Sequence, residues 1–192
     1  MFQGDKQRVV AGLIKKHRQL QVEPEDCIIT NGALGALMVS LQVLTDPGDE
    51  VIMITPWYFF YPAMCEVLGI KLVGVPSLPG IKTFLGQLEP KMLSIILMLY
   101  RFLRQNETGL GKSEQHSESH DLDLEAIERA ISPRTRVILI NSPNNPTGAI
   151  YPKETLQRLS QLLDRSNSDR DSPIFLISDE AYCREVLLTI SF

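Results

Sequence analysis

The sequence has 192 residues, of which 44% are hydrophobic and 22% are charged, and its formal net charge is −4. This acidic balance excludes a general nucleic-acid or anionic-membrane surface, which needs an excess of basic side chains. The three cysteines, Cys27, Cys65 and Cys183, form no CxxC pair and no Cys/His cluster. Their spacing argues against a disulfide scaffold or a metal module and favours a reducing compartment, so we expect a cytoplasmic protein.

Hydrophobic periodicity and turn residues predict alternating helices and strands over the first part of the chain. In order, they are a helix at 7–20, a strand at 27–30, a helix at 33–44, a strand at 50–55, a helix at 59–68 and a strand at 71–75. Val10, Leu13 and His17 mark the apolar face of the first helix. Each helix is followed by a short apolar run, which is the pattern of α/β proteins.

The regular pattern stops over residues 77–120, which we interpret as an atypical loop or insert. Its apolar patch, residues 92–100, is shorter than the roughly 20 residues that span a bilayer. A polar, serine-rich tract follows this patch and is typical of a flexible loop. We therefore expect that residues 77–120 do not join the main sheet and that the chain has no membrane segment.

The alternating pattern resumes with a helix that starts after Asp123, a plausible N-cap. A strand at 136–140, a helix at 152–165 and a strand at 174–178 complete the series. Strands that are apolar on both faces belong to parallel sheets covered by helices. The sequence therefore predicts an α/β domain with a mostly parallel sheet of at least five strands.

Chemically useful residues follow several of these strands, at the edge where α/β proteins bind ligands. The Asn31-Gly32-Ala33 turn opens a helix, so its N–H groups suit a phosphate, although, taken alone, a tight turn that lets the helix pack on the strand explains it better. The aromatic run at 57–61 offers a ring to stack on a planar ligand, with core packing as the alternative.

Two further runs carry polar side chains at strand ends. In the run 141–148, adjacent asparagines between prolines offer amide donors, although such residues also build purely structural loops. Asp179 ends an apolar strand, where a carboxylate is costly to bury unless it is bonded or caps a helix. Tyr182 lies three residues later and would place a phenol on the same side.

Taken together, four segments resemble the large domain of the class I/II aminotransferases, pyridoxal-phosphate-dependent enzymes with the aspartate-aminotransferase fold. They are residues 29–37, 46–62, 121–152 and 174–182, which include SPNNPTG and SDEAY. The resemblance implies an incomplete, three-layer α/β large domain over residues 1–192, with the insert at 77–120. It also implies a role in amino-acid metabolism and biosynthesis.

The resemblance assigns roles to matching positions. Gly32, Ala33 and Leu34 fall at the family's phosphate-binding turn. Tyr58 falls where an aromatic ring stacks on the cofactor, with Trp57 as the second choice.

The remaining roles are polar. Asn145 and Tyr182 fall where an amide and a phenol bond the cofactor's 3′-oxygen. Asp179 falls at the carboxylate that pairs with the pyridine nitrogen, because a nearby carboxylate keeps that nitrogen protonated. The resemblance thus implies Asp179, Asn145 and Tyr182 as catalytic residues and pyridoxal 5′-phosphate as the cofactor.

One expected residue has no counterpart. The family's Schiff-base lysine follows the Asp-x-x-Tyr element, whereas the last lysine of this sequence, Lys153, precedes Asp179. The resemblance implies amino-group transfer between an amino acid and a 2-oxo acid, in a homodimer. For this fragment without the lysine, a non-catalytic truncated relative stays open, as does another pyridoxal-phosphate reaction, such as elimination or decarboxylation.

Overall fold

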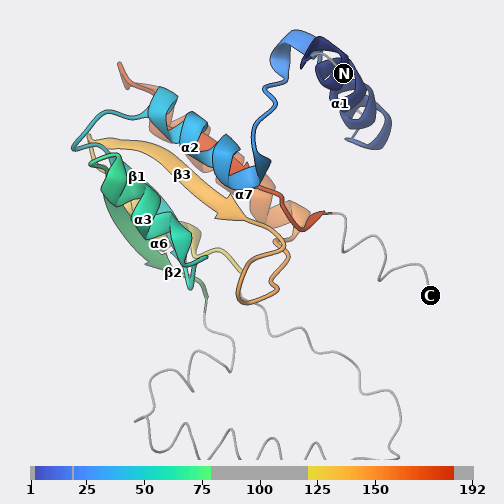
Figure 1. The fold of residues 1–192 in the computed structure, drawn as a ribbon. Helices are drawn as coiled ribbons and strands as arrows, with labels where there is room; N and C mark the ends of the chain where they lie inside the picture. Colours follow the sequence, from blue (N-terminus) through green and yellow to red (C-terminus); the bar gives the residue numbers. More distant parts are fainter. Residues whose placement is uncertain (1–2, 19, 79–120, 184–192) are drawn as a thin grey trace, which may run out of the picture.

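The computed structural model describes residues 3–18, 20–78 and 121–183, which form helices on both faces of a sheet (Figure 1). The helices are α1 (Gln3–Arg18), η1 (Pro24–Asp26), α2 (Gly32–Leu44), α3 (Phe60–Val67), α6 (Leu124–Ala130) and α7 (Lys153–Asn167). The strands are β1 (Glu50–Thr55), β2 (Lys71–Pro76), β3 (Thr135–Asn141) and β4 (Phe175–Asp179). No helix in the described ranges is long and apolar enough to cross a membrane.

The strands form one sheet in the order β2-β1-β3-β4, and every pairing is parallel. The expected parallel α/β architecture is therefore confirmed, but the sheet in the described part has four strands. The strand predicted at 27–30 is wrong, because this backbone bonds elsewhere: the Gln7 side chain donates to the Cys27 carbonyl at 2.7 Å. The Cys27 N–H donates to the Pro24 carbonyl at the end of η1.

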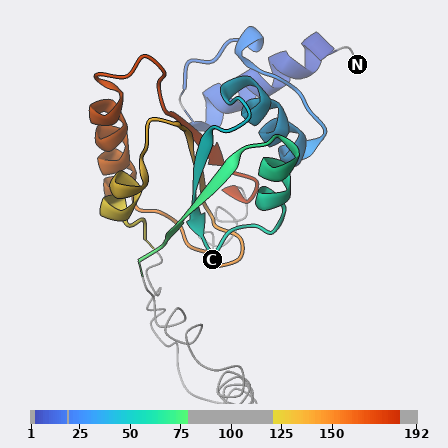
Figure 2. The same ribbon diagram turned by 90° about the vertical axis from the view of Figure 1, so that its left-hand side faces the viewer.

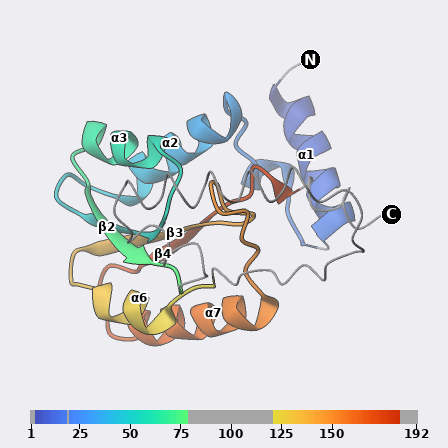
Figure 3. The ribbon, with the colours of Figure 1, turned by 90° about the horizontal axis from the view of Figure 1, so that it is seen from below.

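Alternating side chains divide the sheet into two apolar faces. Ile52 and Ile54 of β1 join the core under α6 and α7. Val51 and Met53 join the core under α2 and α3. Figures 2 and 3 show the resulting three layers, with α2 and α3 on one side of the sheet and α6 and α7 on the other. Burial on both faces is the reason that these strands are continuous apolar runs.

Helix starts and faces follow local sequence signals, with one exception. Asp123 caps α6 as predicted, and its Oδ1 accepts the Ala126 N–H at 2.9 Å. The first helix differs, because its buried residue is Ala11, while Leu13 and His17 are exposed. It stands beside the layered body and contacts η1 rather than the sheet (Figure 1), so its apolar pattern does not mark a core face.

A buried carboxylate connects three segments at the amino ends of the strands. Glu50 begins β1, and its side chain is only 4% exposed. It accepts hydrogen bonds from the Ser132 hydroxyl at 2.6 Å, the Lys71 ammonium at 2.9 Å and the Arg134 guanidinium at 3.1 Å. These bonds, that of Ser132 foremost, lower the pKa of the Glu50 carboxyl to about 2.

The chain leaves and re-enters the described body at a single point. The Leu78 N–H donates to the Asp121 carbonyl at 2.9 Å, and the Ser77 N–H donates to the Thr55 carbonyl at 3.1 Å. The body therefore extends to Leu78, two residues into the predicted insert. The rest of that prediction, residues 79–120, lies outside the described residues.

Candidate active site

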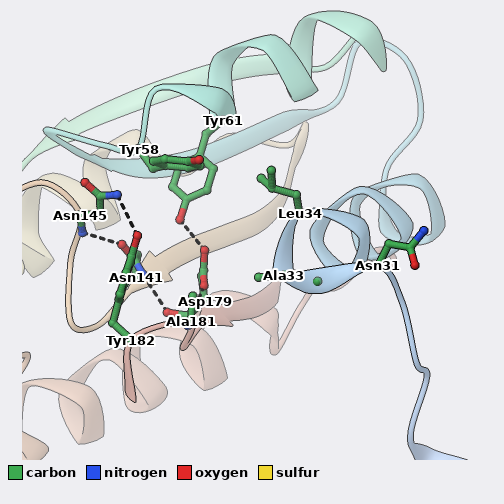
Figure 4. A pocket seen from close by; sticks show the side chains of 11 residues that line it. Asn31, Ala33, Leu34, Tyr58, Tyr61, Asn141, Asn145, Asp179, Ala181 and Tyr182 are labelled. Atoms are coloured by element: carbon green, nitrogen blue, oxygen red, sulfur yellow. Dashed lines mark hydrogen bonds between the residues drawn. The ribbon is translucent and has the colours of Figure 1, made fainter. Parts of the chain in front are cut away.

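A pocket of about 230 Å³ lies at the carboxyl ends of the strands (Figure 4). It brings together the turn that opens α2, the aromatic segment after β1 and the ends of β3 and β4. Its lining includes every residue first assigned to the site from the sequence: Gly32, Ala33, Leu34, Tyr58, Asn145, Asp179 and Tyr182. The expectation that these segments converge at one edge of the sheet is confirmed, while their roles stay predictions.

Asp179 is the buried carboxylate of this pocket. It is the last residue of β4 and is 9% exposed. Its Oδ2 accepts the phenol proton of Tyr61 at 2.7 Å, and its Oδ1 accepts the Ala181 N–H at 3.0 Å. Both oxygens are bonded, so the carboxylate is satisfied and held in a fixed orientation.

Asn141 connects the ends of the two neighbouring strands. It is 3% exposed and lies opposite Asp179 in the register of β3 and β4. Its Nδ2 donates to the Asp179 carbonyl at 2.9 Å, while its Oδ1 accepts the Asn145 N–H at 2.7 Å. One amide therefore fixes the backbone of both a strand end and the following loop.

The loop after β3 separates two asparagines with different tasks. Asn144 turns inward to its own loop, where its Oδ1 accepts the hydroxyl of Thr147 at 2.8 Å. Asn145 instead faces the pocket, and its Nδ2 donates to the Tyr182 hydroxyl at 3.1 Å (Figure 4). Since that bond uses the phenol oxygen as acceptor, the Tyr182 proton remains for an acceptor in the pocket.

The start of α2 forms the exposed wall of the pocket. Gly32 has a φ of 73°, a left-handed conformation that glycine adopts without strain. The following N–H groups of Ala33 and Leu34 belong to the first turn of a helix and have no partner within it. The helix dipole adds partial positive charge there, so this wall suits an anionic group.

The aromatic segment places one ring at the pocket and another elsewhere. Tyr58 is half-buried, lines the pocket and meets the Tyr61 ring edge-on at a centroid distance of 5.6 Å. Trp57 does not line the pocket, so the pocket gives no support to the second choice for ring stacking. Its ring lies against Gly74 of β2, where the missing side chain leaves room for it.

We expect Gly74→Ala to lower the free energy of unfolding by about 1 kcal/mol, the lower end of the cost of forcing a methyl group against packed neighbours, because Gly74 is exposed on the edge strand β2. A Cβ at this position would come within 2.9 Å of Trp57 Cζ3 and within 3.2 Å of Thr55 Cγ2. Urea unfolding measures the change. Gly12→Ala in α1, where a Cβ meets nothing within 4 Å, is the control and should not destabilise. Equal midpoints for the Gly74 variant and the wild type would contradict the prediction.

A scan against protein families matches the description "Aminotransferase class I and II" over residues 6–94 and 108–187. The chain belongs to this family. Class I and II aminotransferases depend on pyridoxal phosphate, so the resemblance seen in the SPNNPTG and SDEAY motifs is confirmed.

Individual relatives agree with the family. The chain is 34% identical over 173 residues to the aspartate/prephenate aminotransferase of Thermus thermophilus, and 30% identical over 174 residues to the aspartate aminotransferase of Thermotoga maritima. Each alignment covers 90% of this chain and 34% of the relative. The chain thus spans about a third of the length of these aminotransferases.

Solved structures support the fold of this aminotransferase segment. The aspartate aminotransferase from Thermus thermophilus with maleate matches with a TM-score of 0.66 at 32% identity, over 92% of this chain and 35% of that one. An aminotransferase from Eubacterium rectale matches with a TM-score of 0.69 at 26% identity, over 92% and 35%. The three-layer α/β fold is therefore that of the aminotransferase family.

Sequence reasoning assigned no role to Tyr61 or Asn141, although both lie in the pocket of this aminotransferase segment. Tyr61 comes three residues after Tyr58, which is the spacing of one helical turn. Asn141 is the last residue of the strand beside β4, so its place opposite Asp179 follows once the strand order is known. That order depends on tertiary packing rather than on a local motif.

The pocket fits the parts of pyridoxal phosphate. The open start of α2 suits its phosphate, the Tyr58 ring suits its pyridine face, and Asp179 suits a protonated ring nitrogen. The paired amide and phenol of Asn145 and Tyr182 offer donors to its ring oxygen. The phosphate, the ring face, the ring nitrogen and the ring oxygen of the cofactor therefore each have a complementary group in the described residues.

We expect Asn141→Leu to weaken both the fold and cofactor binding. The substitution leaves the Asn145 N–H without its acceptor and should cost about 2 kcal/mol of unfolding free energy. Asn167→Leu is the matched control, because Asn167 also bridges backbone groups, binding Ile174 at 3.0 and 2.8 Å, far from the pocket. Urea unfolding and a pyridoxal phosphate titration should show lost stability in both variants and lost affinity in Asn141→Leu alone. Equal affinities in the two variants would contradict this prediction.

Proposed function

We propose that this chain supplies the cofactor-binding part of a pyridoxal-phosphate aminotransferase, which moves an amino group between an amino acid and a 2-oxo acid. The observation that carries the proposal is the buried Asp179 carboxylate, which is bonded by Tyr61 and opens onto a pocket beside the Asn145–Tyr182 pair. Charged groups at the end of a buried strand are costly, so their presence here favours a function over packing.

Each pocket residue has a defined task toward the cofactor. In the turn that Gly32 opens, the N–H groups of Ala33 and Leu34 would bind the phosphate, and Tyr58 would pack on the ring. When bound, pyridoxal phosphate supplies an electron sink for a carbanion at the substrate's Cα.

The polar residues set the charge of the ring. Asp179 would accept a hydrogen bond from the pyridine nitrogen and keep its proton in place, because a nearby opposite charge favours the protonated form. Tyr182 donates its phenol proton to the ring oxygen, and Asn145 holds Tyr182 in position through its amide.

The partners of the whole protein are proposals as well. An amino acid and a 2-oxo acid as substrates, a homodimeric assembly and a cytoplasmic location all follow from the family resemblance and the cysteine usage. Residues 180–192 contain no lysine, so the polypeptide 1–192 has no amine at the position where the family binds its cofactor covalently. This polypeptide should therefore hold the cofactor without a covalent bond and should not turn over.

Two measurements on the purified polypeptide test the proposal. Titration with pyridoxal phosphate, followed by tyrosine and tryptophan fluorescence, should show saturable binding. A coupled assay for 2-oxo acid release should show no turnover above a protein-free control. The absence of saturable binding would overturn the proposed cofactor site, and turnover from a preparation free of host transaminases would overturn the expected inactivity.

A further inference from the structure

Among the described residues, the Asp179 carboxylate accepts one hydrogen bond from a side chain, and that donor belongs to another element. Ala181 donates to Oδ1 from the adjoining turn, and the main-chain carbonyl of Asp179 accepts from Asn141 and from the Ser142 N–H. These contacts fix the backbone and one oxygen. The bond at 2.7 Å from the Tyr61 phenol to Oδ2 is the contact that connects the carboxylate to α3.

Tyr61 is built to be a permanent donor. It is 2% exposed and packs in the core under α2 and α3, so its ring has little freedom to move. Burial, and then the bond to Asp179, raise the pKa of its phenol well above the usual value. The phenol therefore keeps its proton across the physiological range, and Oδ2 always has a donor.

This arrangement fixes the orientation of the carboxylate. A donor on Oδ2 restricts its rotation about the χ2 angle, and Figure 4 shows the Tyr61 hydroxyl directed at the Asp179 carboxylate in the pocket. A carboxylate in a fixed orientation suits a protonated ring nitrogen, because charge-assisted hydrogen bonds depend on geometry.

We propose that Tyr61 is a positioning residue that aims the Asp179 carboxylate at the pyridine nitrogen of the cofactor. The inference rests on the proposed function, because it assigns Tyr61 a task only if the pocket binds pyridoxal phosphate. If Tyr61 had only a structural role, its loss would weaken the binding of the cofactor with or without the ring nitrogen. A positioning role would instead affect only the ligand that contains the nitrogen.

The test compares two ligands on the purified polypeptide: pyridoxal phosphate and its 1-deaza analogue, in which carbon replaces the ring nitrogen. The dissociation constant of the deaza analogue divided by that of pyridoxal phosphate measures how much the ring nitrogen strengthens binding. We expect a ratio of about ten or more for the wild type and near one for Asp179→Asn, because one charge-assisted bond is at stake. Tyr61→Phe should lower the ratio about fivefold or more and change the affinity for the deaza analogue less than twofold.

The matched control is Tyr151→Phe, which removes a phenol hydroxyl from a residue that is 4% exposed in the core under α6 and α7. It should keep the wild-type ratio. Circular dichroism melts verify the fold of each variant. Carbon-13 NMR of wild-type protein labelled at tyrosine Cζ gives a second readout that requires no folded Tyr61 variant. The Tyr61 resonance should move on adding pyridoxal phosphate and stay in place with the deaza analogue.

The outcomes separate the two levels of the argument. If the wild type binds both ligands equally well, the proposed contact between Asp179 and the ring nitrogen is overturned. The inference about Tyr61 is then overturned as well. If the wild type prefers pyridoxal phosphate over the deaza analogue, and Asp179→Asn abolishes this preference while Tyr61→Phe keeps it, only the inference about Tyr61 is overturned. Equal weakening of both ligands by Tyr61→Phe also overturns it, because this result indicates a structural role. If Tyr61→Phe does not fold, the NMR measurement on the wild type decides. A Tyr61 resonance that stays in place with both ligands overturns the inference about Tyr61.

Discussion

Asp179→Ala is expected to lower the affinity for pyridoxal phosphate by about ten- to one-hundredfold, the largest loss that a single substitution in the pocket should cause. The variant removes the carboxylate that would pair with a protonated ring nitrogen, a charge-assisted bond worth about 1.5–3 kcal/mol. Fluorescence titration of wild type and variant under the same buffer conditions measures the ratio. An affinity within twofold of the wild type would contradict the site assignment.

The same variant has a second, separable effect on stability. It leaves the buried Tyr61 phenol without its acceptor, which should lower the free energy of unfolding by about 1–3 kcal/mol. Asp164→Ala serves as the control, because Asp164 is an exposed carboxylate on α7. It should change neither affinity nor stability measurably. Affinities are therefore compared at a temperature well below both melting transitions.

The second large effect concerns the opposite end of the sheet. Glu50→Gln should lower the free energy of unfolding at neutral pH by about 2–3 kcal/mol, since it removes a buried charge and leaves its cationic neighbours uncompensated. The Lys71 and Arg134 side chains are 62% and 64% exposed, so solvent screens them and keeps the loss below that of a fully buried pair. Urea unfolding at neutral pH measures the difference.

The pH dependence of this contact has a definite sign. The pKa of Glu50 is lowered in the fold from its ordinary value of 4.5 to about 2, so the unfolded chain binds the proton more readily. The contribution to stability is complete above pH 4.5 and is lost as the pH falls toward 2. The difference between wild type and Glu50→Gln should shrink over that range. Glu125→Gln, at an 86% exposed position, should show no such trend, and a constant difference for Glu50→Gln would contradict the prediction.

Much of the fold follows from the sequence because each strand is a short apolar run between turn residues. The run at 50–55 is buried on both faces of the sheet, and its boundaries agree with β1. The run at 27–30 has the same apolar character, yet it forms no strand, because its backbone groups bond to Gln7 and Pro24 instead. Local pattern cannot show this competition, since it is decided by a helix some twenty residues away in the sequence.

The sequence likewise predicts some of the residues of the pocket and not others. Asp179 is predictable because a carboxylate at the end of a buried strand is costly unless it serves a purpose, and Asn145 is predictable because adjacent asparagines between prolines offer amide donors. Tyr61 was missed because its ring is counted as core from sequence, and only its hydroxyl reaches Asp179. Trp57 stays a second choice in the sequence because neighbouring aromatic residues look equivalent until the space beside Gly74 takes up the Trp57 ring.

The single hydrogen bond between Leu78 and Asp121 has a consequence for protein engineering. Since it keeps the two attachment points of residues 79–120 side by side, the intervening length adds only a slowly growing loop-closure entropy, about 0.6 kcal/mol for each doubling. This junction is therefore a natural place to graft a foreign domain or to create new chain termini. A reporter inserted there would follow β2 at the carboxyl ends of the strands and would leave the pairing of the four strands intact.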